Sequence, residues 1–207
     1  MPPEWIEQQL RRRGIRDERV LAAMARVPRE AFVPSGARRH AYADAALALS
    51  HGQTISQPYI VALICQALEL QGGERVLDVG TGSGYQAAVL AELAAEVVSI
   101  ERIPELAEQA RRNLEASGYE VDVRVGDGSL GVPDRAPYDA IAVAATAPEV
   151  PEPLYDQLAS GGRLVLPIDE SLVSVTKTAA GRRARFLSPA RFVPLISGLD
   201  RRGQRYS

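Results

Sequence analysis

The sequence predicts an α/β protein with a doubly wound, seven-stranded and mostly parallel sheet. From residue 75 onward, short apolar runs alternate with helical stretches of about 10–15 residues, a pattern typical of parallel strands joined by crossover helices. The first run leads directly into a glycine-rich segment. The last two runs follow each other without a helix between them, which predicts antiparallel strands at one edge of the sheet.

The first part of the chain, residues 1–55, is predicted to be a helical appendage. An amphipathic stretch runs from Pro2 to Arg13, and Asp17 can cap a second helix that ends near Arg26. Two Val-Pro pairs then interrupt the chain, because the residue before a proline avoids the helical region.

Residues 56–170 are predicted to form the α/β core. Ser56 is a favoured cap for a helix over residues 59–70, with a proline in its first turn. The five expected parallel strands are 76–79, 97–100, 121–125, 140–144 and 164–168. The helices expected between them are 85–94, 104–117 and 151–160, and Gly161-Gly162 is expected to turn the chain into the fifth strand.

Residues 171–207 are predicted to supply the antiparallel edge strands, near 172–177 and 191–196, and a basic tail. From Lys177 onward the sequence has eight basic residues and one acidic residue. At 207 residues, the whole chain is expected to be a single domain.

The composition excludes several classes of protein. A net charge of -2 and a pI of about 5.8 argue against a dedicated nucleic-acid binder. No apolar run approaches the roughly 18 residues that a membrane span needs. One cysteine, Cys65, and two histidines predict neither an internal disulfide nor a metal site. We expect a cytoplasmic monomer in which Cys65 belongs to the core.

The glycine-rich segment points to a nucleotide-like ligand. Strand 76–79 leads into Gly80-Thr81-Gly82-Ser83-Gly84, where glycines permit unusual backbone angles and close approach of a ligand. Dinucleotide sites use G-x-G-x-x-G, but here the position of the third glycine is Tyr85. Asp78 would repel a phosphate and could accept hydrogen bonds from an ammonium group, directly or through water. This combination favours S-adenosylmethionine over a nicotinamide dinucleotide.

Two further acids follow the next two predicted strands. Glu101 ends the second strand, which is the usual position of a carboxylate that binds both ribose hydroxyls. Asp127 follows the third strand and could accept a hydrogen bond from an adenine amino group. Since ligands of open α/β sheets bind at the carboxyl ends of the strands, we expect Asp78, Glu101 and Asp127 to face one cavity.

These features resemble the class I S-adenosylmethionine-dependent methyltransferases, and most closely the protein-L-isoaspartate(D-aspartate) O-methyltransferase family. The resemblance covers almost the whole chain, and its most specific motif is GQTISQP at residues 52–58. The other shared motifs are VPREAFVP at 27–34, YAD at 42–44, YDAI at 138–141, APEVP at 147–151 and FVPL at 192–195. Ala46, Ser50 and a shortened segment at residues 169–187 depart from the family pattern.

The resemblance implies a repair enzyme that transfers a methyl group from S-adenosylmethionine to the free α-carboxylate of L-isoaspartyl residues in damaged proteins. It implies that Ser56 is the active-site serine and that residues 53–56 close over the cofactor. The cofactor-binding residues that it implies are Gln53, Thr54, Ile55, Asp78, Val79, Gly80, Thr81, Gly82, Ser83, Gly84, Glu101, Arg102, Asp127 and Gly128.

The implied chemistry needs no general base, because a carboxylate acceptor is already ionised at neutral pH. Ser56 would then orient the acceptor by a hydrogen bond, in addition to capping its helix. The alternatives are another class I methyltransferase acting on a small molecule or RNA, a non-catalytic cofactor-binding module and, least favoured, a nicotinamide dehydrogenase. The basic tail could favour acidic peptides, although a solvated basic edge is the favoured explanation.

Overall fold

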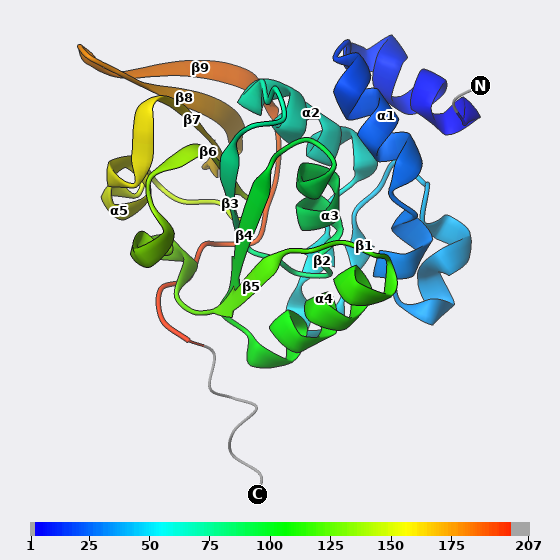
Figure 1. Cartoon of the computed structure of the whole chain (residues 1–207). Coiled ribbons are helices and arrows are strands. Elements are labelled where there is room, and N and C mark those ends of the chain that lie inside the picture. Colours follow the sequence, from blue (N-terminus) through cyan, green and yellow to red (C-terminus); the bar gives the residue numbers. More distant parts are fainter. Residues whose placement is uncertain (1–2, 200–207) are drawn as a thin grey trace, which may run out of the picture.

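The computed structural model describes residues 3–199 and contains a seven-stranded sheet in the order β5-β4-β3-β6-β7-β8-β9 (Figure 1). The strands are β3 (Arg75–Val79), β4 (Glu96–Glu101), β5 (Asp122–Val125), β6 (Tyr138–Val143), β7 (Leu158–Ile168), β8 (Ser171–Thr178) and β9 (Gly181–Pro189). Strands β3 to β7 are parallel, and β8 and β9 add to them as antiparallel edge strands. The predicted fold class is therefore confirmed.

Helices cover both faces of the sheet and enclose two hydrophobic clusters. The helices are α1 (Glu18–Arg26), α2 (Pro58–Leu68), α3 (Tyr85–Ala91), α4 (Pro104–Ala116) and α5 (Glu152–Asp156). Consecutive strand residues point to opposite faces, so Val76 packs in the cluster under α1 to α4 while Leu77 packs in the cluster that contains Leu154 of α5. Within the described residues, no helix is long and apolar enough to span a membrane.

The N-terminal appendage packs against the same core as α2 and α3. Its short helical segments are Ile6–Leu10, Arg11–Arg13, Arg29–Phe32, Ser35–His40 and Ser50–Gly52. As expected, Asp17 caps α1, since its Oδ1 accepts a hydrogen bond of 2.9 Å from the Arg19 amide. A small antiparallel ladder, which the sequence did not predict, joins β1 (Leu47–Ala48) to β2 (Thr54–Ile55).

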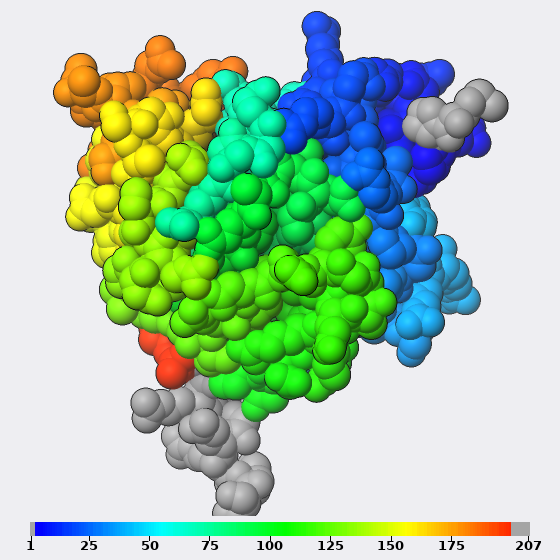
Figure 2. Space-filling view, in the orientation of Figure 1, coloured from blue at the N-terminus to red at the C-terminus, as the bar shows by residue number. Residues whose placement is uncertain are grey.

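Three predictions for the C-terminal half were wrong. The second edge strand is Gly181–Pro189, whereas residues 191–196 return toward the parallel strands as an extended segment. Residues 181–186 are exposed and rich in arginine, so the strand carries no apolar periodicity, and the left-handed Gly181 permits a tight hairpin. The tip of this hairpin projects at the upper left of Figure 2. The expected helix 151–160 is one short helix, α5, and Gly161-Gly162 lies inside β7.

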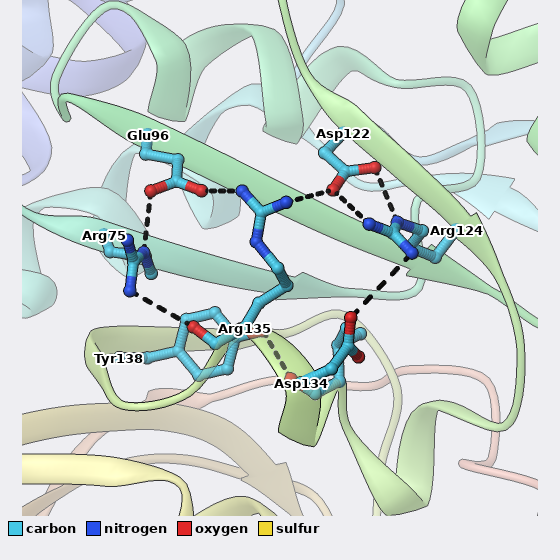
Figure 3. A network of polar contacts seen from close by, with 8 residues as sticks. Arg75, Glu96, Asp122, Arg124, Asp134, Arg135 and Tyr138 are labelled. Atoms are coloured by element: carbon cyan, nitrogen blue, oxygen red, sulfur yellow. Dashed lines mark hydrogen bonds and ion pairs between the residues drawn. The ribbon is translucent and has the colours of Figure 1, made fainter.

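A network of ion pairs joins the amino ends of the parallel strands (Figure 3). Arg75 of β3 bonds to Glu96 of β4 at 2.7 Å, and Arg135 pairs with both Glu96 and Asp122 of β5. Arg124 also bonds to Asp122, at 2.6 Å. These residues stabilise the amino ends of the strands. A ligand is expected at the other, carboxyl ends.

Candidate active site

The glycine-rich segment connects β3 to α3 at the carboxyl ends of the parallel strands. The Gly80 amide donates a 2.9 Å hydrogen bond to the Ile100 carbonyl of β4, which fixes the start of the loop. Gly84 has a left-handed backbone, and a Cβ there would lie 3.2 Å from Cγ of Leu114 in α4. The last glycine of the motif therefore serves the close packing of α3 against α4.

A cavity beside this loop, called here the first cavity, brings together residues from six parts of the chain. Eight residues that the resemblance assigned to the cofactor line it: Gln53, Thr54, Val79, Gly80, Gly82, Glu101, Arg102 and Gly128. The rest of its wall is formed by Ile100, Ala144, Ala145 and residues 193–196. Most of the predicted binding residues thus share one cavity at the ends of β3, β4 and β6.

A smaller inner cavity lies between residues 54–56 and the glycine-rich segment. Three more of the predicted cofactor residues, Ile55, Thr81 and Ser83, line this inner cavity. Ser56 lines it as well, together with Tyr85 at the start of α3. The stretch 53–56 therefore lies against the loop on one side, and its closing over a cofactor stays a prediction.

Glu101 is almost fully buried, and its carboxylate forms part of the wall of the first cavity. Its oxygens accept hydrogen bonds from the amides of Gly82 at 2.9 Å and Ile103 at 3.1 Å. Burial raises the pKa of Glu101, and these amides oppose that shift. The geometry leaves carboxylate lone pairs for ligand hydroxyls at the end of β4, where the sequence placed them.

Asp78 lines neither of these two cavities, so the expectation that its carboxylate faces the ligand cavity was wrong. Its carboxylate is fully buried beneath the loop and accepts hydrogen bonds from Gln86 at 2.7 Å and Ser99 at 2.8 Å. The Ser99 hydroxyl also contacts the hydroxyl of Thr81 at 2.6 Å. Burial raises the pKa of Asp78 to about 6, although both hydrogen bonds oppose the rise. Asp78 supports the loop from below.

The carboxylate of Asp127 is also hydrogen-bonded to other parts of the protein, and it does not line the first cavity. Oδ1 accepts from the Ser129 amide and hydroxyl, and Oδ2 accepts from the Gly198 amide at 2.6 Å. Burial raises the pKa of Asp127, but these hydrogen bonds outweigh it and hold the pKa below its usual value. The expectation that three carboxylates face one cavity was therefore correct only for Glu101.

The residue after Asp127 approaches the first cavity more closely. A Cβ on Gly128 would lie 2.7 Å from Cγ1 of Val79, so a larger residue could not occupy this position without displacing the Val79 side chain. Sequence reasoning missed the other side of the cavity, where the Thr146 amide donates to Val193 at 2.8 Å and the Leu195 amide donates to Thr146 at 2.7 Å. The FVPL motif at residues 192–195 could have revealed this side of the cavity, but the sequence analysis assigned it to an edge strand.

Ser56 lies just before α2 and lines a second cavity. That helix begins at Pro58, and Gln57 occupies its N-cap position without forming a side-chain capping hydrogen bond. The capping role predicted for Ser56 was therefore wrong. The second cavity has a volume of about 360 Å³, and its wall is Ala46, Thr54, Ser56, Gln57, Ile60, Ala144 and residues 189–193. Thr54, Ala144 and Val193 belong to the walls of both the first and second cavities.

The chemistry of the first cavity decides which ligand it fits. Ile100 and Leu195 offer apolar surface, Glu101 offers a hydrogen-bond acceptor, and Arg102 is the only cation among the described residues of its wall. A ribose and a base suit this lining, and a pyrophosphate does not. With the sheet order and the adjoining second cavity, these features define a class I S-adenosylmethionine-dependent methyltransferase.

Comparison with known proteins identifies the family within that class. A family model described as Protein-L-isoaspartate(D-aspartate) O-methyltransferase matches residues 4–200. The chain therefore belongs to the protein-L-isoaspartate(D-aspartate) O-methyltransferase family, whose methyl donor is S-adenosylmethionine.

Individual relatives agree with this assignment over nearly the whole chain. The chain is 52% identical over 206 residues to the protein-L-isoaspartate O-methyltransferase of Methanoculleus marisnigri, covering 97% of this chain and 94% of that protein. The identity is 56% over 198 residues to enzyme 1 of Rhodopseudomonas palustris, covering 92% and 81%.

Solved structures give the same result. A putative protein-L-isoaspartate O-methyltransferase from Plasmodium falciparum, in complex with S-adenosyl-L-homocysteine, superposes with a TM-score of 0.81 at 29% identity, covering 93% of this chain and 96% of that one. A second protein-L-isoaspartate O-methyltransferase gives a TM-score of 0.83 at 32% identity, covering 95% of this chain and 66% of that longer one.

Proposed function

We propose that this chain transfers a methyl group from S-adenosylmethionine, held in the first cavity, to the α-carboxylate of an L-isoaspartyl residue in the second cavity. The observation that carries this proposal is the wall of Thr54, Ala144 and Val193 common to both cavities. A donor and an acceptor placed on either side of it would meet beside Ser56. Such alignment is worth about 7–11 kcal/mol of a reaction barrier in favourable cases.

The transfer requires no proton to be removed from the acceptor. One carboxylate oxygen forms a bond to the methyl carbon while the carbon–sulfur bond breaks and its electron pair goes to sulfur, so opposite charges on acceptor and donor are neutralised together. S-adenosylmethionine supplies the electrophilic methyl group on its sulfonium. Ser56 would donate a hydrogen bond that orients the carboxylate, and residues 53–56 and 193–196 would exclude water from it.

Repair of the damaged residue needs no further catalytic group. The methyl ester has a better leaving group than the carboxylate, so the next main-chain nitrogen attacks it, methanol leaves and a succinimide forms. Hydrolysis of the succinimide returns part of the product to aspartate. A substrate must reach the second cavity in an extended form, which favours flexible or locally unfolded segments.

A paired-peptide assay tests the proposed function. The protein is incubated with labelled S-adenosylmethionine and two peptides that differ only in an L-isoaspartyl or an L-aspartyl residue. Transfer to the isoaspartyl peptide alone is expected. Tight cofactor binding without transfer to either peptide would favour a non-catalytic module, and transfer to a small molecule or RNA instead would favour another methyltransferase.

We also propose that the enzyme acts in the cytoplasm as a monomer. Cys65 is a free, buried thiol in α2, which suits a reducing compartment. Cell fractionation and sedimentation equilibrium test the two statements separately. A membrane-bound or dimeric enzyme would contradict them.

Selection of acidic peptides by the basic C-terminal stretch has weaker support. Arg182 pairs with Glu152 and Arg191 pairs with Glu170, so two of its charges are already matched, and Arg201, Arg202 and Arg205 lie outside the described residues. A KM for acidic peptides that does not change between low and moderate salt would argue against it.

A further inference from the structure

Arg29 is a fully buried cation that the proposed reaction does not yet use. It lies in the short helical segment Arg29–Phe32, its exposed fraction is 0%, and it belongs to the VPREAFVP motif. Arginine is rarely buried without an acidic partner, because removing its charge from water costs several kcal/mol. Among the described residues no carboxylate contacts Arg29, and burial lowers the pKa of its guanidinium.

The contacts of Arg29 lead to the acceptor side of the active site. Its Nε donates to the Ala41 carbonyl at 2.7 Å, and its Nη2 donates to the Ser56 carbonyl at 2.8 Å. The guanidinium carbon lies 4.6 Å from the centroid of the Tyr85 ring. Nη1 is buried and has no hydrogen-bond partner in the described part of the chain.

Ser56 and Tyr85 both line the inner cavity. Arg29 contacts both residues, although its own side chain does not line that cavity. A positive charge behind the Ser56 main chain makes binding of an anion at that place more favourable, and water screens such a charge only weakly when it is buried.

We propose that Arg29 is a positioning residue for the acceptor: it holds the main chain of Ser56 in place and supplies a buried positive charge that attracts the substrate carboxylate. This inference rests on the proposed function. The two effects separate kinetically. The charge stabilises the bound carboxylate, which loses its charge on methylation, so it lowers the KM of the peptide. The hydrogen bond to Ser56 affects alignment and therefore kcat.

A purely structural role is the rival explanation, and Arg19 is the matched control. Arg19 also donates to two main-chain carbonyls, Leu70 at 2.9 Å and Leu93 at 3.2 Å, but it lines none of the three cavities. Arg19→Met removes a comparable connection without affecting the acceptor. Arg29→Met removes charge and hydrogen bonds together, and Arg29→Lys keeps the charge with fewer directed donors.

The deciding measurement compares an isoaspartyl peptide with the same peptide carrying the neutral amide, isoasparagine, as an inhibitor. We expect Arg29→Met to reduce the preference for the acid over the amide by at least about tenfold, with the affinity for S-adenosylhomocysteine changed less than about threefold. Arg29→Lys should keep the preference and lower kcat, and Arg19→Met should change neither. Urea unfolding checks that each variant is folded.

Unchanged preference in folded Arg29→Met, or an equal loss in Arg19→Met, would overturn the inference. If Arg29→Met does not fold, Arg29→Lys decides: a retained preference with lower kcat supports the inference, and a kcat equal to that of the parent contradicts it. A parent enzyme that binds cofactor but methylates no isoaspartyl peptide would instead refute the proposed function. The two failures are therefore distinguishable.

Discussion

The main-chain amide of Gly198 donates a 2.6 Å hydrogen bond to Oδ2 of Asp127, which attaches the C-terminal segment to the end of β5. Arg102, which directly follows β4, donates a 3.3 Å hydrogen bond from its Nε to the Gly198 carbonyl. Residues 193–196, just before this attachment, line the first cavity. The segment crosses the carboxyl ends of the strands in Figure 1, so Asp127 holds this part of the wall of the first cavity in place.

Asp127→Ala is therefore expected to weaken cofactor binding. The substitution removes the bond to Gly198 and the capping of the Gly128–Leu130 turn, so the covering segment loses its attachment. We expect the Kd for S-adenosylhomocysteine to rise about tenfold, measured by calorimetry, which corresponds to about 1.4 kcal/mol. Asp134→Ala, at the opposite end of the strands, is the control and should bind normally. Equal affinities for both variants would contradict the covering role.

Ser56→Ala is expected to lower activity without lowering stability. No side chain caps α2, so the substitution should change the free energy of unfolding by no more than about 0.5 kcal/mol. Loss of one hydrogen bond to a charged acceptor, about 1.5–3 kcal/mol, should reduce the methylation rate about 10- to 100-fold. Ser188→Ala is the control, because the Ser188 hydroxyl bonds to the Pro189 carbonyl. A folded Ser56→Ala enzyme with the parental rate would rule out the orienting role.

The sequence predicted the parts of the structure that apolar burial determines. Strands β3, β4 and β6 are buried on both faces, so they read as continuous apolar runs, and the glycine-rich segment after β3 marked the position of the site. The position of Glu101 in the cavity wall could be predicted because a parallel sheet places the carboxyl ends of its strands side by side. These are properties of topology, which a single sequence encodes well.

Side-chain direction and chain crossings could not be predicted in the same way. Asp78 lies inside a strand whose residues alternate between faces, and only its neighbours Gln86 and Ser99 decide that it is enclosed. The return of residues 193–196 depends on pairing with Thr146, about 50 residues earlier in the chain, for which no local pattern exists. The exposed strand β9 carries arginines rather than an apolar face.

Lys177, the only lysine in the sequence, is expected to stabilise the end of α5. Its Nζ donates to the carbonyls of Tyr155 at 3.2 Å, Asp156 at 3.1 Å and Leu158 at 2.8 Å, as a cation at a helix C-terminus should. Lys177→Met should lower the free energy of unfolding by about 1.5–3 kcal/mol. Lys177→Arg should retain only part of this stabilisation, because a planar guanidinium cannot converge three donors on these carbonyls. Urea unfolding measures both, and a neutral Lys177→Met would disprove the role.

The buried carboxyl of Asp78 makes stability depend on pH in a defined direction. Its pKa is about 6 in the folded protein and about 3.9 in an unfolded chain. Between these values the folded state binds more protons, so the contribution of Asp78 to the free energy of unfolding is greatest below about pH 4 and falls as pH rises through 6. A difference of about two pKa units corresponds to about 3 kcal/mol at most.

Asp78→Asn should therefore stabilise the protein at pH 8 and weaken its binding of S-adenosylmethionine. The neutral amide avoids the cost of a buried charge. Gln86, whose Oε1 is buried without a partner among residues 3–199, can rotate to accept from the new amide. A cationic donor near the loop loses the attraction of a buried negative charge, whereas neutral S-adenosylhomocysteine loses less. Urea unfolding at pH 5 and pH 8 should show a gain in stability that is larger at pH 8, because the parental carboxyl is mostly protonated at pH 5. A gain independent of pH, or equal weakening of both ligands, would mean that the charge of Asp78 is not the cause.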